Sequence, residues 1–224
     1  MKIKGAIFDM DGTLVDSLMF WGFLWETIGE KYFNNKKFLP DKEVELNIRT
    51  MIYTDAMRYF KEYYGIEGDT ESFIRFAEDG IPQFYKDVAK PKAGAYELLD
   101  HLREQGIKMV LASATAKKEI VYALDCYKMT EYFDTILSCA DIGVGKDKPD
   151  IYLDSLSIMG FDCGEVCVFE DSFVALETAK KAGFMTVGIY DKHNPDQNKV
   201  KAASDIYLPE GSSLDTLIPL FSHK

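Results

Sequence analysis

Short apolar runs alternate with longer amphipathic segments over most of this chain. The runs predict strands over residues 5–8, 107–112, 135–138, 166–169, 186–189 and 205–208. Apolar runs of this length are typical of strands that helices cover on both faces. Strands that alternate with helices require right-handed βαβ connections. The pattern therefore predicts an α/β fold with a parallel sheet core and helices on both faces.

The segment after the first strand has a different pattern, with apolar and aromatic residues at three- and four-residue intervals. This spacing predicts helices over residues 18–33, 41–49, 54–64 and 70–85, and Asp16 or Ser17 is suited to cap the first of them. No strand alternation interrupts these helices. We therefore expect an all-helical cap domain over residues 16–85, inserted into a core made of residues 1–15 and 86–224.

Composition narrows the class of protein. The 224 residues carry a net charge of -11, which argues against binding to nucleic acid or to an anionic membrane. No apolar stretch has the length of a signal peptide or a membrane span. The four cysteines lack metal-site spacing, and we expect reduced, mostly buried thiols. We expect a cytosolic monomer with a small-molecule substrate.

Two predicted strands end in acidic residues. Asp9 and Asp11 follow the first strand, and Glu170 and Asp171 follow the strand over 166–169. Residues two apart share a side of an extended chain, so Asp9 and Asp11 can face one space. A divalent cation would relieve the repulsion between such carboxylates, with Asp9 as an oxygen ligand. Gly12 then allows a tight turn close to a bound anion.

Two further strand ends carry groups suited to an anion. Ser113 ends the strand over 107–112, and its hydroxyl and the N–H of Ala114 can bond an anion, although a serine here can also simply cap a helix. Lys146 and Lys148 follow glycines, but the spacing and the missing Ser or Thr exclude a P-loop. Glycines beside a lysine suggest a phosphate loop, and for Lys148 a solvated surface charge is the alternative.

These four segments resemble, in order, the four signatures of the haloacid dehalogenase-like hydrolases. The first signature is similar to FDMDGTLVDS at residues 8–17, the second to Ser113, and the fourth to VFEDS at 168–172. The third places a lysine four residues before the Asp of PDIY at 149–152, which selects Lys146. The family has Pro after this lysine, whereas this chain has Asp147, so Lys148 stays an alternative.

The resemblance implies a Rossmann-like core, a helical cap between the first two signatures, and a magnesium-dependent phosphatase. By that resemblance Asp9 attacks phosphorus, Asp11 is the general acid and base, and Ser113, Ala114, Gly12 and Lys146 bind phosphate. Mg²⁺ would be held by Asp9, the main-chain carbonyl of Asp11, Asp171 and also Glu170. Arg49 resembles a cap position that contacts substrate, against the alternative of a solvated helix arginine. The expected substrate is a small phosphorylated metabolite, such as a sugar phosphate.

Other functions remain open at this point. A phosphosugar mutase of the same family would use the same aspartyl phosphate, although Thr13 favours the hydrolases. A noncatalytic binding protein would not need the complete set of groups. Dehalogenation uses no magnesium and does not need Asp11. The aromatic residues of the helical segment, Phe20, Trp21, Trp25 and Tyr53, are expected to fill its interior rather than to contact a ligand.

Overall fold

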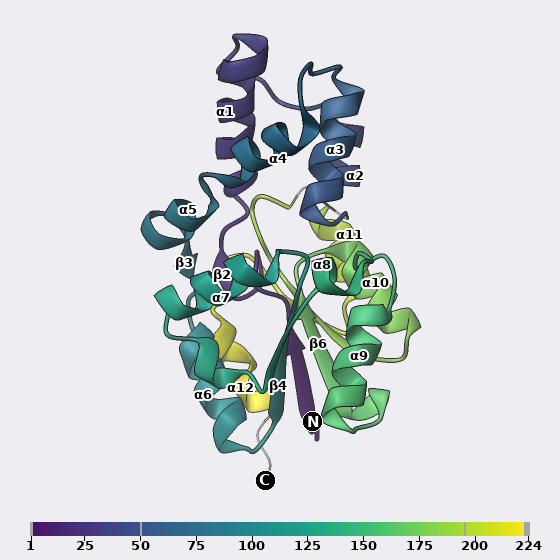
Figure 1. The fold of residues 1–224 in the computed structure, drawn as a ribbon. Coiled ribbons are helices and arrows are strands. Elements are labelled where there is room, and N and C mark those ends of the chain that lie inside the picture. The colour runs from purple at the N-terminus through teal and green to yellow at the C-terminus, as the bar shows by residue number, and fades with distance from the viewer. Residues whose placement is uncertain (1, 50, 195, 222–224) are drawn as a thin grey trace.

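A six-stranded parallel sheet forms the centre of the computed structural model, which describes residues 2–49, 51–194 and 196–221. The strand order is β5-β4-β1-β6-β7-β8, and every pairing is parallel. The strands are β1 (Gly5–Phe8), β4 (Lys108–Ser113), β5 (Thr135–Ser138), β6 (Val166–Glu170), β7 (Met185–Ile189) and β8 (Ile206–Leu208). The predicted α/β fold is confirmed, and all six expected strands are present (Figure 1).

Successive side chains of the central strand enter two different hydrophobic clusters. Ala6 and Phe8 pack in one cluster, and Ile7 packs in the other. Helices α6 (Ala95–Glu104), α7 (Lys117–Cys126) and α12 (Ile218–Phe221) contribute to the first cluster, and α9 (Asp150–Met159) and α10 (Phe173–Lys181) to the second. Both faces of β1 are therefore buried, which explains its continuous apolar sequence.

Four helices form a separate unit beyond the carboxyl ends of the strands (Figure 1). They are α1 (Phe20–Phe33), α2 (Lys42–Ile48), α3 (Tyr53–Tyr63) and α4 (Thr70–Glu78). Trp25 and Phe60 stack in their shared core, with ring centroids 5.0 Å apart, and neither side chain is exposed to solvent. The aromatic content of this segment thus builds an independent hydrophobic core.

The predicted single helix over residues 70–85 is wrong, because the chain breaks after Glu78 and begins again as α5 (Ile81–Asp87). Gly80 is the N-cap of α5 and Pro82 lies in its first turn. Proline lacks an N–H and cannot lie inside a continuous helix. The buried side chains of α5, including Phe84 and Tyr85, pack in the cluster of the sheet core.

We propose that residues 1–15 and 86–224 form the core and that residues 16–85 form the cap. Residues 1, 50, 195 and 222–224 of these ranges lie outside the described residues. The proposed boundary after residue 85 cuts α5, whose packing joins it to the core.

A small sheet joins the two units where the chain passes between them. Strand β2 (Val15–Asp16) pairs antiparallel with β3 (Lys90–Pro91). Strands of two residues leave no periodicity, so the sequence did not predict them. The expected cap of α1 is also wrong, because Met19 takes the N-cap position and the Ser17 hydroxyl donates to Asp11 instead. Short elements were missed for the same reason, among them α8 (Cys139–Ile142) and α11 (Gln197–Ala203).

Candidate active site

The carboxyl ends of β1, β4 and β6 meet at one edge of the sheet. Strand β1 lies between the other two, with Phe8 in register with Leu111 on one side and Phe169 on the other. From β1 the chain continues to β4 on one side, and it later crosses from β5 to β6 on the other side. Such a switch point is where open α/β sheets bind ligands. A cavity of about 180 Å³ lies at this edge, between the strand ends and the helical unit. The topology therefore gathers the polar residues that follow these strands into one space.

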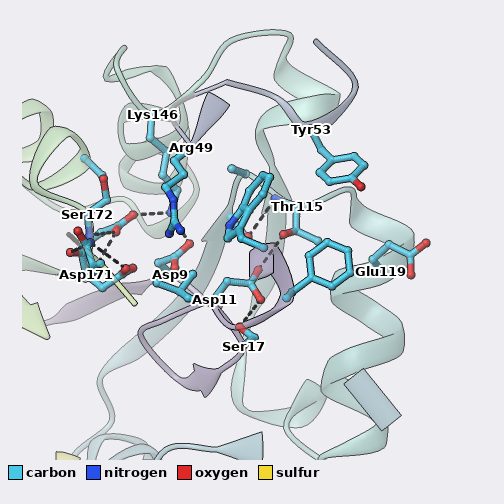
Figure 2. Close-up of a pocket in the computed structure, with 18 of the residues that line it drawn as sticks. Asp9, Asp11, Ser17, Arg49, Tyr53, Thr115, Glu119, Lys146, Asp171 and Ser172 are labelled. Carbon is cyan, nitrogen blue, oxygen red and sulfur yellow. Dashed lines mark hydrogen bonds and ion pairs between the residues drawn. The ribbon is translucent and has the colours of Figure 1, made fainter. Parts of the chain in front are cut away.

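Three carboxylates from two strand ends converge in this cavity. Asp9, Glu170 and Asp171 are all buried, and each offers one oxygen such that the three oxygens lie within 4.8 Å of one another. Only an acid-rich segment after each strand was visible in the sequence, and the structure brings the two segments together (Figure 2). Carboxylates so close repel one another unless cations lie among them.

Lys146 supplies one positive charge to this group. Its Nζ lies 2.5 Å from Asp9 Oδ1 and 2.5 Å from Glu170 Oε1, and 8% of the residue is exposed. Burial opposes its charge, but the neighbouring Asp9 and Glu170 hold the pKa of Lys146 well above its usual range. Lys148, in contrast, is exposed. The structure thus places Lys146, and not Lys148, against the acids.

Glu170 is the most fully engaged of the three acids. Its Oε2 accepts hydrogen bonds from the backbone N–H groups of Asp171 and Ser172, each at 3.1 Å. Its Oε1 accepts from Lys146 and, at 3.4 Å, from the hydroxyl of Tyr152. These contacts fix the turn that carries Asp171 and hold the lysine in place.

Asp171 lies directly beside Gly12. The glycine has φ +83°, and a Cβ at this position would lie 2.6 Å from Asp171 Oδ2. Glycine is thus required both by the backbone conformation and by the approach of the carboxylate. Thr13 donates to Oδ1 at 3.4 Å and Asn194 donates to Oδ2 at 3.3 Å. Gly12 is not one of the described residues that line the cavity, so its contact with substrate stays a prediction.

Burial raises the pKa of Asp171 to about 7, and the charges of Glu170 and Asp191 add to this effect. With Lys146 ionised and all three acids ionised, the group retains two negative charges. Oxygen ligands with this excess charge fit a hard divalent cation such as Mg²⁺. The donor set therefore suits the metal that the sequence predicted, with Asp9 and Asp171 as the carboxylates that have fewer competing contacts.

Asp11 lines the same cavity as Asp9, as the two-residue spacing predicted. It is held by hydroxyl groups rather than by a cation. Oδ1 accepts from Ser17 at 2.7 Å and from Tyr85 at 2.8 Å, and Oδ2 accepts from Thr115 at 2.8 Å. Figure 2 shows the bonds from Ser17 and Thr115.

Ser113 and Ala114 lie in the wall of the cavity at the end of β4. The Ser113 oxygen accepts a hydrogen bond from the backbone N–H of Thr115 at 3.1 Å, which leaves its O–H free to donate. The side chain is buried at this strand end, and its role as a phosphate ligand stays a prediction. The structure thus places both residues beside the acids.

Arg49 enters the cavity from the helical unit, at the C-cap of α2. Its side chain is 18% exposed, and its Nη2 lies 2.7 Å from Glu45 Oε1. Its guanidinium carbon lies 5.7 Å from the ring centroid of Trp21, and its buried Nε has no partner among the residues that the structure describes. The Arg49 side chain is therefore largely buried at the cavity, and its contact with substrate stays a prediction.

The aromatic residues divide between two environments. Trp25 fills the core of the helical unit, as expected, but Phe20, Trp21 and Tyr53 also line the cavity. Helical spacing alone identifies an apolar face and does not show whether the face ends at a cavity. The sequence also gave no sign of Tyr85 as a contact of Asp11, because the two residues are joined only by the tertiary fold.

The fold and the site define an enzyme of the doubly wound α/β class, with an acidic site at the strand ends and a helical unit over it. The chain belongs to the haloacid dehalogenase-like hydrolases, because the family model of that description matches residues 3–183. Curated relatives of the chain carry the names of phosphatases.

A phosphorylated carbohydrates phosphatase of Thermotoga maritima is 27% identical over 181 residues, which cover 81% of this chain and 82% of the relative. Hexitol phosphatase B of Escherichia coli is 25% identical over 190 residues, covering 83% of each chain. The crystal structure of CbbY from Rhodobacter sphaeroides in complex with phosphate is similar in fold, with a TM-score of 0.78, 19% identity and 96% coverage of each chain.

All four cysteines are free, and two of them, Cys139 and Cys167, are buried, whereas Cys126 is exposed. In the described parts of the chain, no helix combines the length and the apolar character needed to cross a membrane.

Proposed function

We propose that this protein is a magnesium-dependent phosphatase that hydrolyses a small phosphorylated carbohydrate through an aspartyl phosphate. The observation that carries the proposal is the convergence of Asp9, Lys146 and Asp171 at the edge of one cavity. Phosphoryl transfer depends on position and on countercharge, because negative charge spreads over the three equatorial oxygens. The site supplies a nucleophile and charged groups within one enclosed space.

In the first step an oxygen of Asp9 forms a bond to phosphorus while the bond from phosphorus to the ester oxygen breaks. The electron pair of that bond goes to the departing oxygen, and Asp11 gives this oxygen its proton. In the second step Asp11 takes a proton from water as the water oxygen forms a bond to phosphorus. The bond from phosphorus to Asp9 breaks and its electron pair returns to the Asp9 carboxylate, which releases phosphate. Water thus supplies the oxygen that the released phosphate gains and the proton that Asp11 takes up.

Lys146, Ser113 and the N–H of Ala114 are proposed to bind the phosphate oxygens. Lys146 is supported by its position against Asp9, since a phosphate bound there would come close to its ammonium group. Mg²⁺ would be held by Asp9, Asp171 and the carbonyl of Asp11, with Glu170 beside them, and would supply charge stabilisation to the phosphoryl group. Gly12 is proposed to keep the space beside Asp171 open.

The far end of the substrate is proposed to contact the helical unit. Arg49 lines the cavity and its buried Nε has no partner among the described residues, while Trp21 and Tyr53 offer flat apolar surfaces. Such a wall suits a carbohydrate, whose C–H faces pack on rings while its hydroxyls accept hydrogen bonds. The names of the curated relatives, which include a phosphorylated carbohydrates phosphatase, support the same class. The free cysteines support the proposed cytosolic location.

The experiment is phosphate release from glucitol 6-phosphate, glucose 6-phosphate and glucose 1-phosphate, with and without Mg²⁺. We expect release that depends on Mg²⁺ and is abolished in Asp9→Asn, while circular dichroism shows the same fold. Accumulation of glucose 6-phosphate from glucose 1-phosphate without release of phosphate would instead identify a mutase. Normal turnover in Asp9→Asn would refute the nucleophile assignment.

A further inference from the structure

Tyr85 is a buried polar residue that the steps above do not use. We propose that Tyr85 is a positioning residue for Asp11, holding the carboxyl group where it can deliver a proton to the departing oxygen. The inference rests on the proposed function, because it assigns Asp11 its role as the general acid. Its basis is the 2.8 Å hydrogen bond from the Tyr85 hydroxyl to Asp11 Oδ1.

Three separate parts of the chain determine the orientation of the Asp11 side chain. Ser17 lies in the first connection to the helical unit, Tyr85 lies in α5 on the return connection, and Thr115 follows β4. Two hydroxyls hold Oδ1 and one holds Oδ2, so rotation of the carboxyl group would break contacts on both oxygens. Such support from neighbouring groups is what keeps a catalytic side chain in its productive geometry.

Tyr85 is held through both its backbone and its side chain. It is 5% exposed, and its backbone carbonyl accepts a 2.5 Å hydrogen bond from the hydroxyl of Tyr127. Ser17, by comparison, has a second acceptor, since its hydroxyl lies 3.3 Å from the carbonyl of Val15. An aromatic side chain packed in the core cluster has few orientations available, so its hydroxyl gives Asp11 a fixed reference point.

The role of Asp11 depends on the leaving group, which makes the inference testable. An alkoxide from a sugar phosphate is strongly basic and needs a proton as the ester bond breaks. Nitrophenolate is a stable anion and leaves without one. A residue that positions the general acid must therefore matter for the sugar phosphate and matter little for p-nitrophenyl phosphate.

The experiment compares kcat/KM of Tyr85→Phe for glucitol 6-phosphate and for p-nitrophenyl phosphate, both with saturating Mg²⁺. One hydrogen bond to the Asp11 carboxyl group is removed, so we expect a loss of about tenfold for the sugar phosphate and less than about twofold for p-nitrophenyl phosphate. The matched control is Tyr132→Phe, which removes a phenolic hydroxyl that donates to Asp100, away from the residues that line the cavity. We expect the control to leave the ratio of the two values unchanged.

Equal losses for both substrates in Tyr85→Phe would show a merely structural role and would overturn the inference, as would no loss for either substrate. The same change of ratio in Tyr132→Phe would also overturn it. If Tyr85→Phe does not fold, Thr115→Val removes the donor to Oδ2, and the same selective loss is expected. A wild-type enzyme that hydrolyses neither substrate would refute the proposed function itself, a different outcome from any of these.

Discussion

Removal of the Lys146 charge is expected to unbalance the whole acidic group. In Lys146→Met the side chain keeps nearly the same length and loses its ammonium, so Asp9 and Glu170 each lose a partner at 2.5 Å. The site lies inside the protein, where solvent screens such charges weakly. Three buried carboxylates would then face one another without a compensating cation in protein that has been stripped of metal.

The magnitude follows from the burial of the pair. Breaking a buried ion pair by removing one partner costs about 3–5 kcal/mol, because the other charge stays buried. For a chain of this length each kcal/mol lowers the melting temperature by about 2–4 °C, so we expect a decrease of about 10 °C at pH 8. The matched control is Lys148→Met, whose exposed side chain should change the free energy of unfolding by less than about 0.5 kcal/mol.

The assay is thermal unfolding of both variants in chelator, followed by circular dichroism at pH 8 and at pH 5. The loss in Lys146→Met should shrink at pH 5, because Asp9 and Asp171, whose pKa values are raised by burial, then take up protons and repel less. An equal loss at both pH values would mean that shape rather than charge determines the effect. An unfolding curve like that of the wild type at pH 8, or an equal effect of Lys148→Met, would refute the reasoning.

Three other predictions concern the glycine, the acid and the arginine of the site. Gly12→Ala should abolish turnover, because the added Cβ would meet Asp171. The control is Gly143→Ala, where φ is +87° and the surrounding space is open. It should lower the free energy of unfolding in urea by only about 1–2 kcal/mol. In metal-free protein the pKa of Asp171 is raised from its usual 3.8 to about 7. The stability linked to this shift is complete below pH 3.8 and is lost as the pH rises to 7. Urea midpoints should therefore fall over that range. Mg²⁺ should therefore raise the urea midpoint more at pH 8 than at pH 5, and an equal rise would contradict this. Arg49→Gln should raise KM for a sugar phosphate about tenfold with little change in kcat, while Arg58→Gln, on an exposed helix face, should leave both unchanged.

Much of the fold could be predicted because its signals are local. The apolar run of β1 is continuous since Ala6, Ile7 and Phe8 are all buried, and that pattern is visible in the sequence alone. The break between α4 and α5 was visible only as Gly80 and Pro82, which the apolar spacing on either side concealed. The monomeric state stays a prediction.

The candidate site was predictable where acids follow strands, and not where the tertiary fold supplies the contact. Asp9 and Asp171 each end an apolar run, so their meeting followed from the parallel sheet. The choice of Lys146 over Lys148 needed the structure, because both lie in one loop and only one is buried. The bond from Tyr85 to Asp11 spans 74 residues and leaves no pattern in the sequence.

The central claim is that acids from two distant strand ends together hold one divalent cation. Calorimetric titration of Mg²⁺ into chelator-treated protein at pH 7.5 tests it most directly, with the wild type compared to Asp171→Asn. The account predicts one ion bound per chain and an affinity at least about tenfold lower in the variant, as expected for loss of a charged ligand. No binding of Mg²⁺ by the wild type, or the same affinity in Asp171→Asn, would contradict it.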